Sequence, residues 1–265
     1  PRNPCYIYKD AEYTACLVQE FTWEKRAKMD QPSWGGSSRT PLTERYGRGA
    51  PLEVVVELAN QLNRDPWFNI PHNATNDYVR NYATYVRDHL KPHLKAYLEY
   101  TNEPWNGIFW GALYVREKGK IPGETSLYTA GYKYYSTRAV EIFDLWKEVF
   151  GSSDRLMRIL NTYTLDEWMS KNMLANNSNY KSVDALASAP YFYGCWSRAA
   201  SNGTAIAACS DTTTIPKVVK EATTIDDIFS IIDNPNCCPS SVKISLPNIS
   251  IHSLKPFMPT VLYCV

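Results

Sequence analysis

Four strand-like runs alternate with helix-like segments between residues 51 and 190, and no hairpin turn joins any two of the strands. The strand-like runs are short and largely apolar, and they span residues 66–71, 96–101, 155–161 and 183–190. Helical spacing of apolar residues predicts helices that begin near Pro51 and at Thr75 or Asn76, one or two within 107–149, and another over 165–174. Strands separated by helices pair in parallel through right-handed crossovers. We therefore expect an α/β protein with a parallel sheet.

An open doubly wound sheet and a closed barrel both satisfy this alternation. No Gly-rich phosphate loop follows any of the strands, which removes the usual nucleotide-binding use of the open sheet. The chain has 265 residues and is 44% hydrophobic, which suits a single barrel domain of about 250 residues. We therefore predict a (β/α)8, TIM-barrel-like fold.

The two ends of the chain lack this rhythm. The first 50 residues are polar and rich in turn formers, apart from a β-like patch at 13–18. Residues 197–215 are expected to form a loop and 217–232 a helix, whereas 234–265 contains no Asp or Glu and no strand–helix alternation. We therefore expect one barrel-like domain over 1–233 and an irregular C-terminal segment of uncertain origin over 234–265.

Charge and motif content exclude several functions. The net charge of +1 provides no basic surface for nucleic acid or an acidic membrane, and no apolar run reaches the roughly 18 residues that span a bilayer. Neither the four His nor the seven Cys have the spacing of metal ligands, and no G-x-S-x-G elbow is present. We expect no nucleic-acid or membrane partner, no metal and no cofactor.

Cysteines and glycosylation signals favour a secreted, extracellular protein. Cys195 and Cys209 would close a loop across a Ser-, Asn-, Gly- and Ala-rich segment, as a disulfide does in many secreted proteins. Sequons lie at four positions, and we expect glycans at three of them because a glycan at Asn73 would crowd the barrel mouth; the three are Asn176, Asn202 and Asn248. The first residues include neither an initiator Met nor an apolar signal core, so the sequence is read as a mature form or, as we favour, a fragment.

The run EYTNEPWN at residues 99–106 contains the most specific chemistry of the chain. A strand ends there in an Asn-Glu-Pro turn, which would present Glu103 beside a side-chain amide and an indole. Glycosidases present a proton-donating carboxyl group at a strand end in this way. If the strand stays regular, Glu99 shares the side of Glu103 and would be buried as an ion-pair or hydrogen-bond partner. The aromatic residues Trp105, Phe109 and Trp110 fit a sugar platform and ordinary core packing equally well.

From about residue 22 to residue 232, the chain resembles the glycoside hydrolase superfamily of (β/α)8 barrels with an Asn-Glu proton donor on strand 4. Within it, the chain is similar to large, uncharacterised extracellular proteins that are often labelled cellulose-binding. Three motifs in the right order carry this resemblance. They are LAN at 58–60 with WFNIPH at 67–72 for strand 3, EYTNEPWN at 99–106 for strand 4, and APYF at 189–192 for the end of strand 6.

The resemblance implies that Glu103 is the general acid/base of a retaining glycosidase. It also implies that Asn102 binds the sugar 2-hydroxyl, that Trp105 walls a subsite, and that His72 and Tyr191 line the site, Tyr191 beside the nucleophile.

The superfamily nucleophile is a Glu that ends strand 7, and this chain departs from the pattern there. None of the carboxylates after Tyr191 ends a strand-like run, and strands 1, 7 and 8 are not recognisable. We therefore expect an incomplete barrel and leave open whether the chain is an enzyme. It would be a glycoside-hydrolase-like protein acting on an extracellular polysaccharide by retention. Alternatively, it would be a non-catalytic, glycan-associated component of an extracellular matrix such as a chitinous cuticle or calcified shell.

Overall fold

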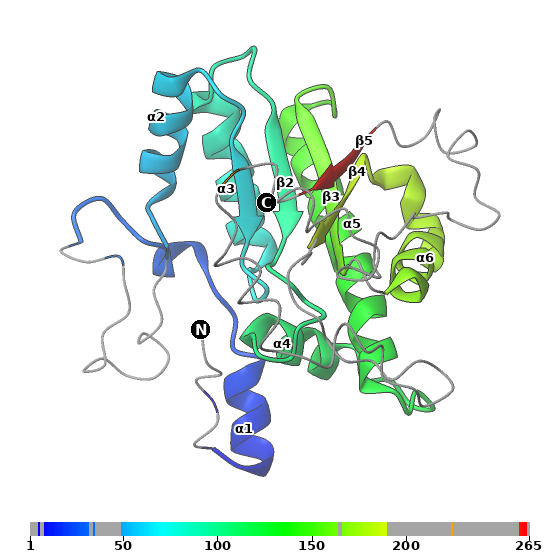
Figure 1. The fold of residues 1–265 in the computed structure, drawn as a ribbon. Helices are drawn as coiled ribbons and strands as arrows, with labels where there is room; N and C mark the ends of the chain where they lie inside the picture. Colours follow the sequence, from blue (N-terminus) through cyan, green and yellow to red (C-terminus); the bar gives the residue numbers. More distant parts are fainter. Residues whose placement is uncertain are drawn as a thin grey trace. The chain divides into compact units, whose positions relative to one another are not determined.

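The computed structural model describes residues 5, 8–31, 34, 49–163, 166–189, 224 and 260–263 of the chain (Figure 1). The chain divides into two units. The first spans Pro1–Ala189 and His252–Cys264 and contains every helix and strand described below. The second spans Pro190–Ile251 and Val265, and Thr224 is its only described residue.

Five parallel strands form one sheet in the order β1-β2-β3-β4-β5 (Figure 1). Their bounds are Trp67–Ile70 for β1, Ala96–Tyr100 for β2, Leu156–Tyr163 for β3, Ala185–Ala189 for β4 and Thr260–Tyr263 for β5. The predicted α/β class with a parallel sheet is confirmed. Closure of the sheet into a barrel stays a prediction. So does the domain boundary at residue 233, although β5 shows that the last segment contributes a strand.

The predicted helices between the strands are present. Their bounds are Leu52–Leu62 for α2, Asn76–His89 for α3, Trp110–Lys118 for α4, Leu127–Phe150 for α5 and Glu167–Ala175 for α6, which the 3-10 helix η3 (Asn176–Ser182) follows. As expected, Thr75 caps α3, since its side chain accepts a hydrogen bond from the Tyr78 backbone N–H at 3.1 Å. Gly151 ends α5 in the left-handed conformation (φ 77°) that glycine favours. The expected loop at 197–215 and helix at 217–232 lie outside the described residues, Thr224 apart.

The β-like patch at 13–18 was a wrong prediction, because most of it belongs to helix α1 (Asp10–Leu17). Short apolar runs fit either period, so contacts with the rest of the chain decide. A disulfide joins Cys16 to Cys5, Leu17 is buried, and the Trp110 indole N–H donates to the Leu17 carbonyl oxygen at 3.3 Å. The 3-10 helix η2 (Trp23–Lys25) follows α1.

The two faces of the sheet differ in chemistry. Phe68, Leu98 and Leu160 point into the main core, which they share with residues of α3 and α5. The opposite face has a small apolar cluster of Ile159, Ala185 and Ala187, with Trp67, Tyr97 and Met157 packed against it. Alternation along the strands places Glu99 and Asn161 on this second face. Among the described helices, none has the length and apolar character needed to cross a bilayer.

Candidate functional site

The site residues lie where the parallel strands end. His72 follows β1, Glu103 and Trp105 follow β2, and Tyr163 is the last residue of β3. Ligands of parallel α/β sheets bind beyond the carboxyl ends of the strands. The topology therefore brings three of the predicted positions to the edge where such a site is expected.

A buried carboxyl group anchors this edge. Glu99 is 5% exposed, and its two oxygens accept hydrogen bonds from the Trp67 indole N–H at 2.7 Å and the Asn161 amide at 2.8 Å. Burial raises the pKa of Glu99, although hydrogen bonds from Trp67, Asn161 and Asn69 oppose that rise; the Glu103 carboxylate adds to it. The sequence-based prediction that Glu99 is buried and internally hydrogen-bonded is confirmed.

Asn161 joins this carboxyl group to Trp105. The Asn161 side-chain oxygen accepts from the Trp105 indole N–H at 3.0 Å, and its backbone N–H donates to the Tyr135 hydroxyl at 2.6 Å. The Trp105 ring stacks on Tyr163 with centroids 4.5 Å apart and planes 22° apart. Trp105 is thus fixed on two sides, which supports its predicted place at the site. Sequence reasoning missed Asn161; its only signal was a polar residue at the end of an apolar run.

Glu103 lies in a sharp turn. Strand β2 ends at Tyr100, and both Thr101 (φ 53°) and Glu103 (φ 42°) have left-handed backbones. Side-chain alternation therefore does not continue to Glu103. The half-buried Glu103 carboxylate accepts a hydrogen bond from the Asn106 amide at 2.9 Å, whereas Asn102 is exposed. Left-handed non-glycine residues each cost about 1–3 kcal/mol and gather at functional sites.

His72 is held in an aromatic enclosure formed by α4. Its ring lies 4.9 Å from Trp110 and 5.1 Å from Tyr114, measured between centroids. Burial lowers the pKa of His72 to about 4, so the ring is neutral at pH 7. Its Nε2 atom is buried and has no hydrogen-bond partner within the described part of the chain. A Cβ added at Gly111 would lie 3.0 Å from Thr101 Oγ1 and 3.6 Å from the His72 side chain, so α4 packs closely on this site.

Several predicted positions lie outside the described residues, namely Tyr191, Cys195, Cys209, Asn202 and Asn248. Asn176 is described, and its amide nitrogen donates to Ser136 Oγ at 2.9 Å and Thr137 Oγ1 at 3.1 Å on α5. Glycosylation at the three predicted positions and the disulfide at 195–209 stay predictions. The disulfide that the structure does contain, Cys5–Cys16, was missed because cysteine spacing does not fix connectivity.

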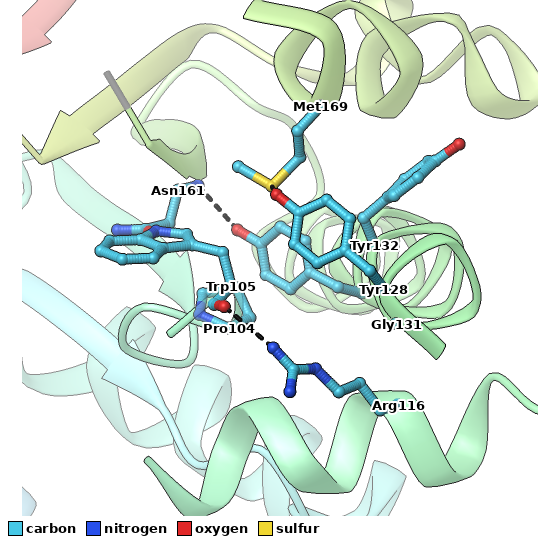
Figure 2. A pocket seen from close by; sticks show the side chains of 9 residues that line it. Pro104, Trp105, Arg116, Tyr128, Gly131, Tyr132, Asn161 and Met169 are labelled. Carbon is cyan, nitrogen blue, oxygen red and sulfur yellow. Dashed lines mark hydrogen bonds between the residues drawn. The ribbon is translucent and has the colours of Figure 1, made fainter. Parts of the chain in front are cut away.

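A small pocket opens beside Trp105 (Figure 2). Its volume is about 270 Å³ including the part open to solvent, with room for about one water molecule at its centre. Five segments line it: the turn at 104–105, Arg116 of α4, four residues of α5, Asn161 of β3 and Met169 of α6. The Arg116 guanidinium donates to the Trp105 carbonyl oxygen at 3.2 Å. No group of His, Cys, Asp and Glu residues suited to holding a metal ion occurs in the described residues.

No known family model matches this chain, and neither a curated protein nor a solved structure is significantly similar to it.

Proposed function

We propose that this chain is a glycoside-hydrolase-like protein that acts on an extracellular polysaccharide by a retaining mechanism, with Glu103 as the acid/base. The observation that carries the proposal is the placement of Glu103. Its half-buried carboxylate follows the carboxyl end of β2 in a left-handed turn, held by Asn106 and two residues from the fixed Trp105 indole.

The sheet supports a (β/α)8 barrel as the proposed complete architecture. One face packs on α3 and α5, while the other combines small residues such as Ala185 and Ala187 with the hydrogen-bonded Glu99 and Asn161. Barrel interiors are filled by side chains from alternate strand positions, and polar groups gather toward the carboxyl ends of the strands. The second face therefore has the composition expected of a barrel interior.

Retention needs two carboxyl groups about 5–5.5 Å apart, one to protonate the leaving oxygen and one to attack the anomeric carbon. Glu103 would donate the proton to the glycosidic oxygen and later remove a proton from the incoming water. Glu99 is poorly suited to the attacking role, because it is buried and both of its oxygens already accept hydrogen bonds. In the superfamily the nucleophile is a Glu at the end of strand 7, whereas no carboxylate after Tyr191 in this chain ends a strand-like run. The resemblance places this nucleophile after Tyr191, outside the described residues.

The surroundings of Glu103 fit carbohydrate. Trp105 is half-buried and stacked on Tyr163. Its indole is therefore already ordered before a ligand binds, which lowers the entropic cost of binding. Asn102 is exposed next to Glu103 and is free to turn toward a sugar hydroxyl group. The Cys5–Cys16 disulfide supports the proposed extracellular location, because such bonds persist in oxidising compartments.

Hydrolysis of a panel of soluble and insoluble polysaccharides by the full-length secreted protein tests this proposal. Glu103→Gln should lower the rate at least about 100-fold, because it removes the transferable proton. Glu57→Gln on the exposed surface of α2 is the matched control and should leave the rate unchanged. Proton NMR of the first product should show the anomer of the substrate.

Full activity in the Glu103→Gln variant would remove Glu103 from the mechanism. Binding to insoluble chitin or cellulose without product release from any substrate would instead favour the non-catalytic matrix component.

A further inference from the structure

Arg116 is a cation with unused hydrogen-bonding capacity beside the candidate site. A guanidinium has five N–H donors, and among the described residues its only hydrogen bond is the one from Nη2 to the Trp105 carbonyl oxygen. No carboxylate of the described chain forms an ion pair with it; the neighbouring Glu117 pairs with Lys120 instead. Within the described residues, the other N–H groups of Arg116 have no hydrogen-bond partner.

Two glycines leave room for the Arg116 side chain beside the pocket. A Cβ added at Gly131 would lie 2.9 Å from Arg116 Cγ, and one added at Gly107 would lie 3.2 Å from Nη1. Larger residues at these positions would force the guanidinium to move. Figure 2 shows Arg116 reaching from α4 toward Pro104 and Trp105.

Three carboxyl groups lie next to residues of the pocket lining, and each already accepts a hydrogen bond: Glu99 from Asn161, Glu103 from Asn106, and Asp166 from Tyr128. Asp166 accepts the Tyr128 hydroxyl on one oxygen at 2.6 Å and the Met169 backbone N–H on the other at 2.8 Å, where it caps α6. Asp166 does not line the pocket, whereas Tyr128 and Met169 do. Asp166 caps α6 and forms no ion pair with Arg116 within the described residues.

The shape of the pocket limits what can enter it. Its walls include Trp105, Tyr128, Tyr132 and Met169, and its centre holds a group about as large as one water molecule. A whole sugar ring is too large, but one oxygen of a substituent fits. Outside, the Trp168 side chain is 52% exposed and meets the Tyr132 ring edge-on at 5.3 Å. An exposed indole of this kind can stack on the ring that carries the substituent.

We propose that this pocket is a subsite for an anionic substituent of the polysaccharide, a carboxylate or a sulfate ester, bound by Arg116. This inference rests on the proposed function and gives its substrate class as acidic polysaccharides. The sugar ring would lie against the exposed aromatic surface of Trp168, while one anionic oxygen enters the pocket and accepts N–H groups of the guanidinium. Arginine suits this role because its guanidinium stays charged and presents several N–H donors to the oxygens of a carboxylate or a sulfate ester.

Binding to four oligosaccharides of equal length, measured by calorimetry at low salt on the full-length protein, tests the subsite. They are an oligouronate, its methyl ester, a sulfated oligosaccharide and a neutral one. The uronate or the sulfated ligand should bind at least about tenfold more tightly than the ester and the neutral ligand, because a charge-assisted bond is lost in the latter two. Whichever of the two charged ligands binds more tightly identifies the substituent as a carboxylate or a sulfate ester.

Arg116→Gln should remove this preference, and Arg116→Lys should retain part of it. Lys118→Gln, the same loss of charge on an exposed position of α4, is the matched control and should bind as the wild type does. If Arg116→Gln fails to fold, Gly131→Ala displaces the guanidinium without changing the charge and should weaken anion binding. Equal affinity for the uronate and its ester, or an unchanged preference in folded Arg116→Gln, would overturn the subsite.

The two proposals fail separately. Hydrolysis that depends on Glu103 but shows no preference for charged chains would overturn the subsite alone. Arg116-dependent binding of an acidic chain without any hydrolysis would support the subsite and count against the catalytic role of Glu103.

Discussion

The amide group of Asn161 bridges Glu99 and Trp105, donating to the buried carboxyl oxygen at 2.8 Å and accepting the indole N–H at 3.0 Å. One side chain near the end of β3 thus helps to hold the aromatic residue two positions after the proposed acid/base.

Replacing Asn161 by Ala should destabilise the protein by about 1–3 kcal/mol, because two buried polar groups lose their partner. Urea unfolding measures this change. Asn172→Ala on α6 is the matched control, since among the described residues its amide bonds only to the Trp168 carbonyl oxygen of its own helix; it should cost about 0.5 kcal/mol or less. Equal effects of the two substitutions would contradict the bridging role.

Glu99→Gln should destabilise the fold by a similar amount, about 1–3 kcal/mol at pH 7. Both Glu99 oxygens accept N–H groups, from Trp67 and Asn161, so an amide nitrogen in either place would face a donor. Burial raises the Glu99 pKa above its usual value of 4.5, so the native protein keeps this proton to a higher pH than the unfolded chain does. The Glu99 contribution to stability is therefore largest in acid and decreases as the pH rises through its folded-state pKa.

Comparing wild type with Glu99→Gln across that pH range checks the sign. The free energy of unfolding of the wild type should decline relative to that of the variant as the pH rises from about 4. A difference that grows in the opposite direction would mean that the hydrogen bonds outweigh burial.

His72 should make the fold sensitive to mild acid. Burial lowers its pKa from 6.5 to about 4, so the unfolded chain binds a proton that the native chain does not. Stability is present in full above pH 6.5 and is lost as the pH falls toward 4, by about 3 kcal/mol at most. Urea unfolding of wild type and His72→Phe between pH 7.5 and 4 isolates this contribution. A constant difference between the two across that range would show that the ring is not enclosed as described.

Loss of the Cys5–Cys16 disulfide should change the environment of His72 through helix α1. Cys5→Ser with Cys16→Ser opens a short loop, which should lower stability by about 2–3 kcal/mol. Helix α1 contacts Trp110 through the Leu17 carbonyl, and Trp110 packs on His72, so the His72 ring signals in an NMR spectrum should shift as well. Unchanged signals in a destabilised variant would show that α1 is independent of the site.

The spacing of apolar residues in the sequence predicts those helices and strands that bury one apolar face in the core. The apolar face of α3 follows from helical spacing, and the sequence limits its cap to Thr75 or Asn76. Four of the predicted strands agree with the structure to within two residues at each end. The prediction for residues 13–18 was wrong because the few apolar residues there fit the helical and the strand period equally well. The helix that forms is held by a disulfide and by a contact with α4.

The site itself was only partly predictable. Glu103 and Trp105 stand in a recognisable motif, whereas Asn161 becomes important only once β3 lies beside β2, with Glu99 paired to Ile159. The left-handed backbone of Glu103 could not be foreseen, because glutamate rarely adopts it and the surrounding contacts impose it. The pocket likewise depends on Gly131 of α5, where a side chain would meet Arg116 of α4.

Glycine tolerates the backbone angles at positions 101 and 103 better than Thr101 and Glu103 do. A laboratory selection for heat resistance alone would therefore favour glycine there. Each such gain in melting temperature would delete a side chain, and at position 103 that side chain is the carboxylate. Selection for thermal stability and selection for catalytic turnover would therefore favour different residues in this turn.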